Sequence, residues 1–578
     1  MSSFYLSKRN YKKDFSVRLY AVSQVWNAQK GRQVKDKQIY LGCKHADGRY
    51  SFNSNAVTYL SLLRGTEFER AFYNWQDYQN EQKALNKPIA QDEKVKLIDE
   101  ATVLDAGTDL LLSTVSEKCG LTDTLTDVFG ECLSDSLLCL AYYCVANPRS
   151  PIYAASTWSL DQKLPGFNPE IDGELSCNEI SKIMGQVSES LVLDFLQKWL
   201  ERFPKEHRLS LDITSVSSYS KNCPEVMYGY NRDHEKLPQI NLLMMVDQET
   251  KLPVWIEKLP GAIGDITTIK DTIKLLKQLD NSPRAIVCDR GFASKENIKC
   301  LQENNFKFTM GLPLYRFSDV RDIIKTAVDA HEFNQPGITV DLFEEFGTLP
   351  SQAITKVVKW NDHRVYLHLY YCADYRTKNH NELMTHIDHV SEALKQGKEI
   401  KSEFDKHLVE KCFSVKTTPV RGLKVTCDPA KVAELEEEYG GYFVIASNQI
   451  KDPKEALYVY KLRDGVEKRF DDLKNEEDCH RLRMHSSQRI TARVFIQFLA
   501  QILRCWLLNE RQKNETLWKE LKLGTKTVND IMRAMKPLKY IHINGHHSFF
   551  KRPTKTQIAL MKFFGISTEN RLSWPSLH

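Results

Sequence analysis

Between residues 208 and 312, the order of strand and helix patterns constrains the fold of this chain more than any other part of its sequence. RLSLDITSVSSY (208–219) alternates apolar and polar residues as a strand does, and QINLLMMVD (239–247) and LPVWIEKLP (252–260) predict two more strands. There follow a helical pattern (265–279), an apolar run (284–289), a short helix (295–305) and a fifth strand (306–312). The predicted order is three strands, helix, strand, helix, strand.

This is the order of an RNase H-like fold, in which helices cover a central mixed sheet. Asp212 lies midway along the first predicted strand, and Asp289 ends the fourth. An aspartate at a strand end is commonly only a turn former. Because the first and fourth strands of this fold are neighbours, however, we expect the two carboxylates to lie close together.

A second constellation lies in EALYVYKLRDGVEKRFDDLK (455–474). On a continuous helix, Tyr460, Arg463, Glu467 and Lys474 would fall within an arc of roughly 60°. An apolar stripe beside them predicts a face packed on a core, and consists of Val459, Leu462, Val466, Phe470 and Leu473. Considered alone, such a mixed-charge face is more often a solvated surface with i,i+4 pairing. The two aspartates favour a functional site instead.

Three carboxylates on two strands and a helix suit two divalent cations. Mg²⁺ prefers oxygen ligands and keeps several waters, so a few carboxylates and phosphate oxygens complete its shell. Two such ions activate an attacking water or hydroxyl and stabilise the departing oxygen in phosphoryl transfer. The predicted chemistry is therefore phosphoryl transfer dependent on two Mg²⁺ ions, for which Mn²⁺ can substitute.

The chain resembles insertion-sequence transposases of the Asp-Asp-Glu class. More narrowly, it is similar to the group with the signature Tyr-x2-Arg-x3-Glu-x6-Lys, the insertion-sequence-four group and its relatives, through the run above, CDRGF (288–292) and MHSSQRITARVFIQFLAQILR (484–504). The similarity extends from about residue 98 to 508. The sequence departs from the family pattern at Asp464, where tryptophan is frequent, and Gly465 weakens the helix by about 1 kcal/mol relative to alanine.

The resemblance implies a metal-binding catalytic triad and a set of DNA contacts. The triad would be Asp212, Asp289 and Glu467. The DNA-binding residues would be Tyr460, Arg463, Lys474 and Arg290. It further implies binding of terminal inverted repeats and target DNA by a homodimer in a synaptic complex.

At 578 residues the chain is too long for one core, and the patterns predict several regions. The predicted fold class is α/β: an RNase H-like core interrupted by a β-rich or mixed insertion domain, with N-terminal β+α and helical DNA-binding regions. The expected boundaries are an N-terminal DNA-binding region (1–95), a helical domain (96–205), the two parts of the core (206–313 and 449–510), the insertion domain (314–448) and a basic C-terminal region (511–578).

Two features within these regions have alternative meanings. The basic opening KRNYKK and the turn KGRQVKDK (30–37) resemble an arm that touches phosphates, but ordinary surface lysines explain them equally well. Trp360, in the insertion domain, resembles an aromatic that stacks on a flipped base in some relatives. A tryptophan on a strand is more often part of the core.

Composition sets the remaining limits. The 80 basic and 75 acidic residues nearly cancel, so any nucleic-acid surface must be a local cluster. No long apolar run or signal-peptide core is evident, and Cys132, Cys139 and Cys144 lie in an apolar stretch typical of reduced core thiols. We therefore expect no membrane partner, no structural zinc, and a cytoplasmic location of bacterial type at the nucleoid.

The leading hypothesis is an enzyme that cuts transposon ends and joins their 3′ hydroxyls to target DNA. A transposase-derived DNA-binding protein without cleavage and a non-transposing nuclease on the same fold are the alternatives. Inverted repeats flanking the coding region would favour the first.

Overall fold

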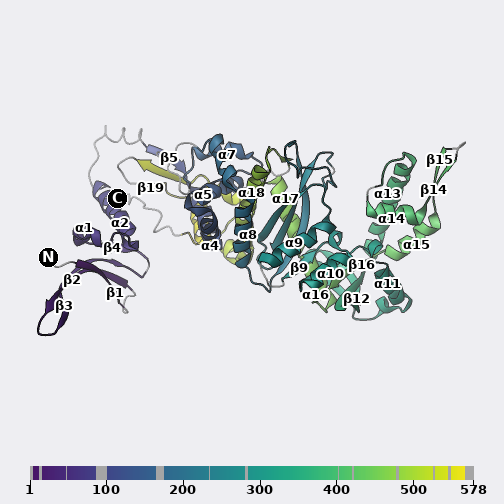
Figure 1. Ribbon diagram of the computed structural model, residues 1–578, viewed down its shortest axis with the longest axis horizontal. Coiled ribbons are helices and arrows are strands. Elements are labelled where there is room, and N and C mark those ends of the chain that lie inside the picture. The colour runs from purple at the N-terminus through teal and green to yellow at the C-terminus, as the bar shows by residue number, and fades with distance from the viewer. Residues whose placement is uncertain are drawn as a thin grey trace. The chain divides into compact units, whose positions relative to one another are not determined.

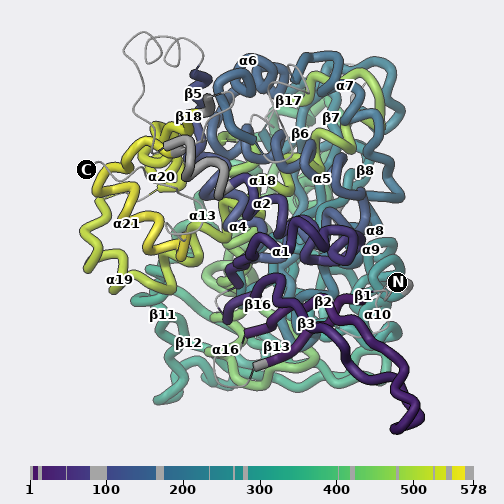
Figure 2. The backbone as a smooth tube through the Cα atoms, turned by 90° about the vertical axis from the view of Figure 1, so that its left-hand side faces the viewer, coloured from purple at the N-terminus to yellow at the C-terminus, as the bar shows by residue number. Residues whose placement is uncertain are grey.

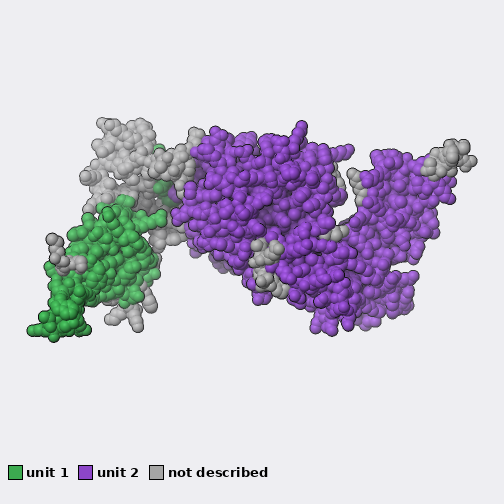
Figure 3. Space-filling view, viewed as in Figure 1, with its two compact units in different colours: residues 1–104, 539–552, 569–578 green, residues 105–538, 553–568 purple. Residues whose placement is uncertain are grey.

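The computed structural model describes residues 4–11, 16–46, 48–85, 101–164, 175–233, 235–279, 284–400, 402–418, 422–476, 481–524, 527–543 and 549–566. The chain divides into two compact units (Figure 3). Unit 1 comprises residues 1–104, 539–552 and 569–578, and unit 2 comprises 105–538 and 553–568.

Unit 1 is built on a four-stranded antiparallel sheet in the order β1-β2-β3-β4. Its strands are β1 (Phe4–Tyr11), β2 (Ser16–Asn27), β3 (Arg32–Lys44) and β4 (Tyr50–Phe52). The helices α1 (Ser54–Thr58) and α2 (Glu67–Leu85) follow, and Phe68 and Phe72 of α2 pack on Leu19 and Leu41 of the sheet. The expected strands around the basic turn are present. The basic opening KRNYKK, for which an arm and an ordinary surface are equally expected, lies partly in β1.

Two further strands of unit 1 come from the C-terminal region. β18 (Lys539–Ile543) lies between β19 (Phe549–Phe550) and β5 (Ala101–Asp105) in a three-stranded sheet. Segments more than 400 residues apart in the sequence therefore share one sheet.

The helical region expected before residue 200 is present in unit 2, and one long helix near the C-terminal end packs against it. Its helices are α4 (Gly107–Cys119), α5 (Leu121–Ala146), α6 (Ala155–Ser159), α7 (Cys177–Gln186) and α8 (Glu189–Glu201). Helix α18 (Ser487–Lys513) packs against α5 and against the sheet strand β8 (Figures 1 and 2), as its apolar sequence predicts. Three short helices, α19 (Glu515–Glu520), α20 (Val528–Met535) and α21 (Lys555–Phe564), end unit 2.

Helices α5 and α18 are long and apolar enough to cross a membrane by length and composition alone. In α18, 94% of the most apolar window is buried within the protein, the state of a core helix. Within α5, Cys139 and Cys144 are buried as expected, but Cys132 is exposed, because it lies on the solvent side of the first turns after the kink at Gly130.

A ten-stranded mixed sheet forms the centre of unit 2. All five strands expected between residues 208 and 312 are present as β6 (Arg208–Ser218), β7 (Gln239–Asp247), β8 (Pro253–Pro260), β9 (Ala285–Cys288) and β10 (Lys307–Leu312). Their spatial order is β8-β7-β6-β9-β10, with β9 parallel to both β6 and β10. The expected helices between them are α9 (Asp265–Leu279) and α10 (Lys295–Glu303). The first and fourth strands are neighbours, as predicted.

Apart from the hairpin described in the next paragraph, the described strands of residues 314–448 do not form a sheet of their own. β16 (Tyr442–Ser447) pairs antiparallel with β10, and β13 (His363–Tyr371), β12 (Thr348–Trp360) and β11 (Thr339–Leu342) extend the same sheet beyond it. This region belongs to unit 2, as do strands β6 to β10. The expected insertion is therefore partly a continuation of the central sheet, with α11 (Ser318–Asp329) before β11 and α12 (Phe343–Phe346) between β11 and β12.

Residues 373–441 form a separate lobe between β13 and β16. It contains α13 (Ala373–Lys395), α14 (Glu403–Cys412), the hairpin β14 (Phe413–Thr418) and β15 (Gly422–Cys427), and α15 (Pro429–Tyr439). Leu383, Ile387, Leu408 and Leu435 give it a small core of its own.

The segment expected to be one continuous helix over 460–474 consists of two. α16 (Pro453–Lys461) ends before Leu462, and α17 (Asp464–Asn475) begins after Arg463. The amides of Gly465 and Val466 bond the carbonyls of Leu462 and Arg463, three residues back, so a tight turn joins the helices. The predicted apolar stripe is buried except at Leu462, which is half-buried at this turn.

Candidate active site

Sheet pairing brings the two predicted aspartates together. In the parallel pairing of β6 with β9, Leu211 lies opposite Cys288. Asp212 and Asp289 each follow one of these residues, so they occupy adjacent positions where β9 ends. Helix α17 packs across β6 and β7 and adds Glu467 from the third element. The structure therefore places the three predicted carboxylates around one point.

The guanidinium of Arg463 occupies that point. Its Nη1 donates a hydrogen bond to Glu467 Oε1 at 2.8 Å and lies 3.5 Å from Asp212 Oδ2. Its Nη2 lies 3.8 Å from Asp289 Oδ1. One cation thus touches all three carboxylates, and it does so from the turn between α16 and α17, which aims the side chain at the sheet.

Arg463 is nearly buried, with a side chain that is 10% exposed. Burial alone would lower the pKa of its guanidinium, but the negative charges of Asp289, Asp212 and Glu467 outweigh burial and raise that pKa. Within the described part of the chain its Nε has no hydrogen-bond partner. The three carboxylates hold this side chain by charge.

Asp212 is the most enclosed of the three carboxylates. Its side chain is 17% exposed, compared with 36% for Asp289 and 53% for Glu467. Burial raises its pKa to about 7, although Arg463 and the amide of Ile213, which donates to Asp212 Oδ1 at 2.8 Å, act in the opposite direction. The site carries more negative charge than one guanidinium neutralises, and a further cation would stabilise it.

Tyr460 supports Asp289. Its hydroxyl donates a hydrogen bond to Asp289 Oδ1 at 2.9 Å, and its ring lies 5.5 Å from the Arg463 guanidinium carbon. Burial and the charge of Asp289 raise the pKa of the phenol, so it stays a donor. Gly311 on β10 makes room for it, because a Cβ there would lie 2.6 Å from the Tyr460 hydroxyl.

Lys474 does not lie with the other signature residues. Its ammonium is held by both oxygens of Asp233, at 2.7 and 2.9 Å, and its side chain is 10% exposed. Asp233 belongs to the connection between β6 and β7, so the pair ties that connection to α17. The sequence predicts a positioning role, and no chemical step, for Arg232, Asp233 and His234 in this connection, and His234 lies outside the described residues.

Arg290 follows Asp289 in the short 3₁₀ turn Arg290–Phe292 and is exposed. It lies at the rim of the carboxylate site, where a phosphate could reach it. Trp360, in contrast, packs its ring on Phe317, with centroids 5.8 Å apart and planes at 25°. It is half-buried, as the core interpretation of this residue predicts.

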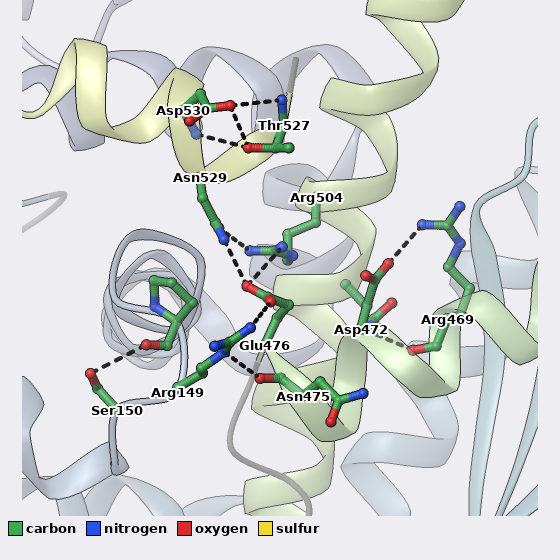
Figure 4. A network of polar contacts seen from close by, with 12 residues as sticks. Arg149, Ser150, Arg469, Asp472, Asn475, Glu476, Arg504, Thr527, Asn529 and Asp530 are labelled. Carbon is green, nitrogen blue, oxygen red and sulfur yellow. Dashed lines mark hydrogen bonds and ion pairs between the residues drawn. The ribbon is translucent and has the colours of Figure 1, made fainter. Parts of the chain in front are cut away.

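The C-terminal end of α17 is fixed by a polar network (Figure 4). Glu476 accepts from Arg149 Nη2 at 2.9 Å and from Asn529 Nδ2 at 2.7 Å, while Arg504 lies 3.9 Å away. Burial alone would raise the pKa of Glu476, but the hydrogen bonds from Asn529 and Arg149 lower it. Arg149 also donates through Nε to the carbonyl of Asn475, which caps the helix end. Glu467 therefore stands on a helix held at its far end.

The donor set is the one that hard divalent cations prefer, because it consists of carboxylate oxygens alone. Among the described residues, no group of three or more His, Cys, Asp or Glu side chains is arranged to hold an ion as it stands. Binding of one ion by all three carboxylates would require the Arg463 guanidinium to move from between them.

Residues 204–503 match the sequence model of the family described as "Transposase DDE domain". No curated protein matches the chain. Among solved structures, a cryo-EM structure of the piggyBac transposase synaptic complex with hairpin DNA is 12% identical, and the match covers 73% of this chain and 70% of that chain with a TM-score of 0.32. A likeness this slight carries no part of the argument. The family match confirms the resemblance to transposases, whereas membership of the narrower Tyr–Arg–Glu–Lys group stays a prediction.

Proposed function

Because the chain belongs to the transposase DDE domain family, we propose that it binds the terminal inverted repeats of an insertion sequence, cleaves those ends and joins their 3′ hydroxyls to target DNA. We also propose an RNase H-like core, which the strand order β8-β7-β6-β9-β10 supports. Membership of the Tyr–Arg–Glu–Lys group is proposed as well, and the four signature residues support it.

One observation carries the proposal. Asp212, Asp289 and Glu467 come from two strands and a helix widely separated in the sequence, and all three lie within 3.8 Å of one guanidinium. Structural ion pairs on a protein surface rarely gather three acids around one base at the end of a strand pair. In a chain of this family, such a cluster supports a catalytic centre.

The three carboxylates would hold two Mg²⁺ ions, for which Mn²⁺ can substitute. When bound, such ions activate the attacking water or hydroxyl and stabilise the leaving oxygen. Asp212 and Asp289 stand on paired strands, so their spacing is fixed by the sheet. Tyr460 orients Asp289 through its hydrogen bond, and Arg463 balances the carboxylate charge at rest.

The DNA contacts are proposed from the position of the cations. Arg290 is exposed beside Asp289 and is placed to meet a phosphate near the cleaved bond. Arg463, once released from the carboxylates, would contact the backbone of the bound DNA strand from within the site. Tyr460 lies beside it and would contact the same backbone. Lys474 would act through Asp233 unless DNA displaces that carboxylate. A homodimer holding two ends in a synaptic complex, in a bacterial-type cytoplasm, completes the proposal and rests on the family resemblance.

Glu467→Gln tests the proposal. It removes one carboxylate charge at constant size, so Mg²⁺- or Mn²⁺-dependent cleavage of a cognate end should be lost, while retardation of that DNA in a gel persists. Asp471→Asn is the matched control, because Asp471 is exposed on the same helix and should leave cleavage intact. Cleavage retained in Glu467→Gln would refute the triad.

The element itself offers a second test. Inverted repeats flanking the coding region, cleaved at their outer ends by the purified protein, are the expected substrate. Cleavage of any duplex without regard to those ends would indicate a non-transposing nuclease, and binding without cleavage by the unaltered chain would indicate a transposase-derived DNA-binding protein.

A further inference from the structure

Strands β2 and β3 of unit 1 continue as a two-stranded ribbon beyond the sheet that contains their base (Figures 1 and 2). Among the described residues, β1 pairs with β2 as far as Ser23, and β2 and β3 stay paired from Gln24↔Lys35 to Asn27↔Arg32. We call residues 24–35 the ribbon. A turn that includes Gly31, at φ +57°, closes it.

The ribbon has no core. At its base, Leu19, Ala21, Val22 and Leu41 are fully buried under the helices of unit 1. From Gln24 to Lys35 no residue is buried on either face, and Trp26 is 67% exposed. An isolated two-stranded hairpin is marginally stable in water. An exposed tryptophan ring contributes no burial energy to the stability of the fold. These residues therefore do not serve the packing of the unit.

The charge of the ribbon is of one sign. It carries Lys30, Arg32 and Lys35 and no acidic residue. The first acid after it, Asp36, accepts a hydrogen bond from the Ser23 hydroxyl at 3.4 Å, at the irregular pairing where the ribbon begins. Three cations on a two-stranded projection fit a polyanion rather than an apolar or basic partner.

The dimensions match duplex DNA. Four residue pairs at about 3.4 Å per residue extend the ribbon by roughly 12 Å past the sheet. The major groove is about 12 Å wide and about 8.5 Å deep, and it admits a two-stranded β-ribbon. Side chains at the tip would reach base edges while cations along the strands meet phosphates on either side.

We propose that this ribbon enters a groove of the terminal-repeat duplex, with Trp26 against the bases and Lys30, Arg32 and Lys35 on the phosphates. The inference rests on the proposed function, and it assigns recognition of the repeat to the N-terminal unit. The sequence weighs a phosphate-binding arm and ordinary surface lysines equally, and the exposed ring and the lack of buried residues in the ribbon favour the arm.

The test measures binding of the full chain to a fluorescent duplex of the element's end across a range of salt concentrations. Arg32→Ser with Lys35→Ser should weaken binding at least tenfold and reduce the slope of log K against log salt by about 2, because each phosphate contact contributes about 0.9. Lys274→Ser with Lys299→Ser is the matched control, since both lysines are exposed in unit 2, and its slope should not change. Equal slopes in the two double variants would overturn the proposal.

Trp26→Ser separates base contact from charge. It should reduce discrimination between the cognate end and a scrambled duplex, with the salt slope unchanged. A variant in which Asn-Gly replaces residues 25–34 joins Gln24 to Lys35, which already lie opposite each other, so the sheet below stays intact. It should lose cognate preference altogether; full preference in this variant would refute the assignment.

The two proposals fail differently. If the ribbon does not read the repeat, its variants bind and cleave cognate ends as the unaltered chain does, and Glu467→Gln still abolishes cleavage. If the chain does not act on such ends, the unaltered protein shows no cognate preference and no metal-dependent cleavage. A change in oligomeric mass on ribbon removal would show that the ribbon instead joins two copies of the chain, and would also refute the assignment.

Discussion

At the scale of residues, the charge balance of the candidate active site depends on Arg463, whose guanidinium lies within 3.8 Å of all three carboxylates. The spacing of the signature predicts that it lies near Glu467, and the strand order predicts that Asp212 meets Asp289. That the guanidinium stands between all three acids depends on the turn at Leu462 and Arg463, which no periodicity indicates. The sequence predicts a positioning role for Asp233 but not its pairing with Lys474, and it gives no sign of the role of Gly311, because both contacts join distant elements.

Replacing Arg463 with Met should leave the negative charge of the three carboxylates uncompensated. Without the guanidinium, the enclosed Asp212 and its neighbours repel one another, and breaking a largely buried pair costs about 3 kcal/mol. We expect a lower melting temperature in EDTA and a larger rise on addition of Mg²⁺ than in the unaltered chain, because the ion then meets uncompensated carboxylates.

Arg469→Met provides the comparison for that experiment. Arg469 is also nearly buried on α17, but it pairs with Asp472 at 3.2 Å, away from the triad. It should lower the melting temperature without altering the response to Mg²⁺. If both variants respond to Mg²⁺ as the unaltered chain does, Arg463 does not neutralise a cation site.

At the scale of elements, the alternation of strands and helices could be predicted because each has a strong pattern. The strands over 208–312 appear within two residues of their expected bounds. The prediction of a single helix over 460–474 was wrong, because Gly465 weakens helix propagation. The sequence does not reveal the break, because one tight turn leaves the periodicity of the side chains nearly unchanged. Such a turn keeps the apolar stripe packed on the core and directs the Arg463 side chain toward the carboxylates.

Strand β13 contains a buried imidazole that predicts a pH dependence. His368 is fully buried, donates through Nε2 to the carbonyl of Ile450 at 3.1 Å and lies 2.9 Å from the Thr355 hydroxyl. Burial lowers its pKa from 6.5 to about 4. The unfolded chain therefore binds this proton at higher pH than the folded chain does, so stability is complete above pH 6.5 and falls as pH drops toward 4.

Chemical denaturation between pH 7 and 4 measures this effect, which amounts to about 3 kcal/mol at most. His368→Gln should show a shallower loss of stability over that range than the unaltered chain. His363→Gln, at an exposed position of the same strand, is the control and should follow the unaltered curve. Parallel curves for His368→Gln and the unaltered chain would contradict the account.

At the scale of the whole molecule, unit 2 is organised around one large sheet to which the expected insertion adds strands. Length alone predicts several domains, and composition cannot show that β16 pairs with β10, because an edge strand and a strand of a new sheet have the same pattern. The basic and acidic residues of the chain nearly cancel overall, and the sequence indicates a local excess of cations at the turn of residues 30–37. Only the structure shows that β2 and β3 stay paired beyond the sheet there.

The lobe of residues 373–441 should be dispensable for the sheet. Tyr371 pairs with Tyr442, and the amide of Cys372 bonds the carbonyl of Gly441 at 2.9 Å, so the lobe leaves and rejoins at one hairpin. Replacing residues 373–440 with Asn-Gly supplies a two-residue turn between paired ends. We expect β13 and β16 to keep their protection in hydrogen exchange, and loss of that protection would contradict this division.

The central claim, that these carboxylates bind the catalytic ions directly, is tested most directly by changing their metal preference. Asp289→Cys replaces a hard oxygen ligand with a thiolate, which favours softer ions over Mg²⁺. The measurement is cleavage of a cognate end in Mg²⁺ alone and in Mg²⁺ supplemented with Mn²⁺ or Cd²⁺. The account predicts that Asp289→Cys loses cleavage in Mg²⁺ and regains it with the softer ion; undiminished cleavage in Mg²⁺ alone would contradict it.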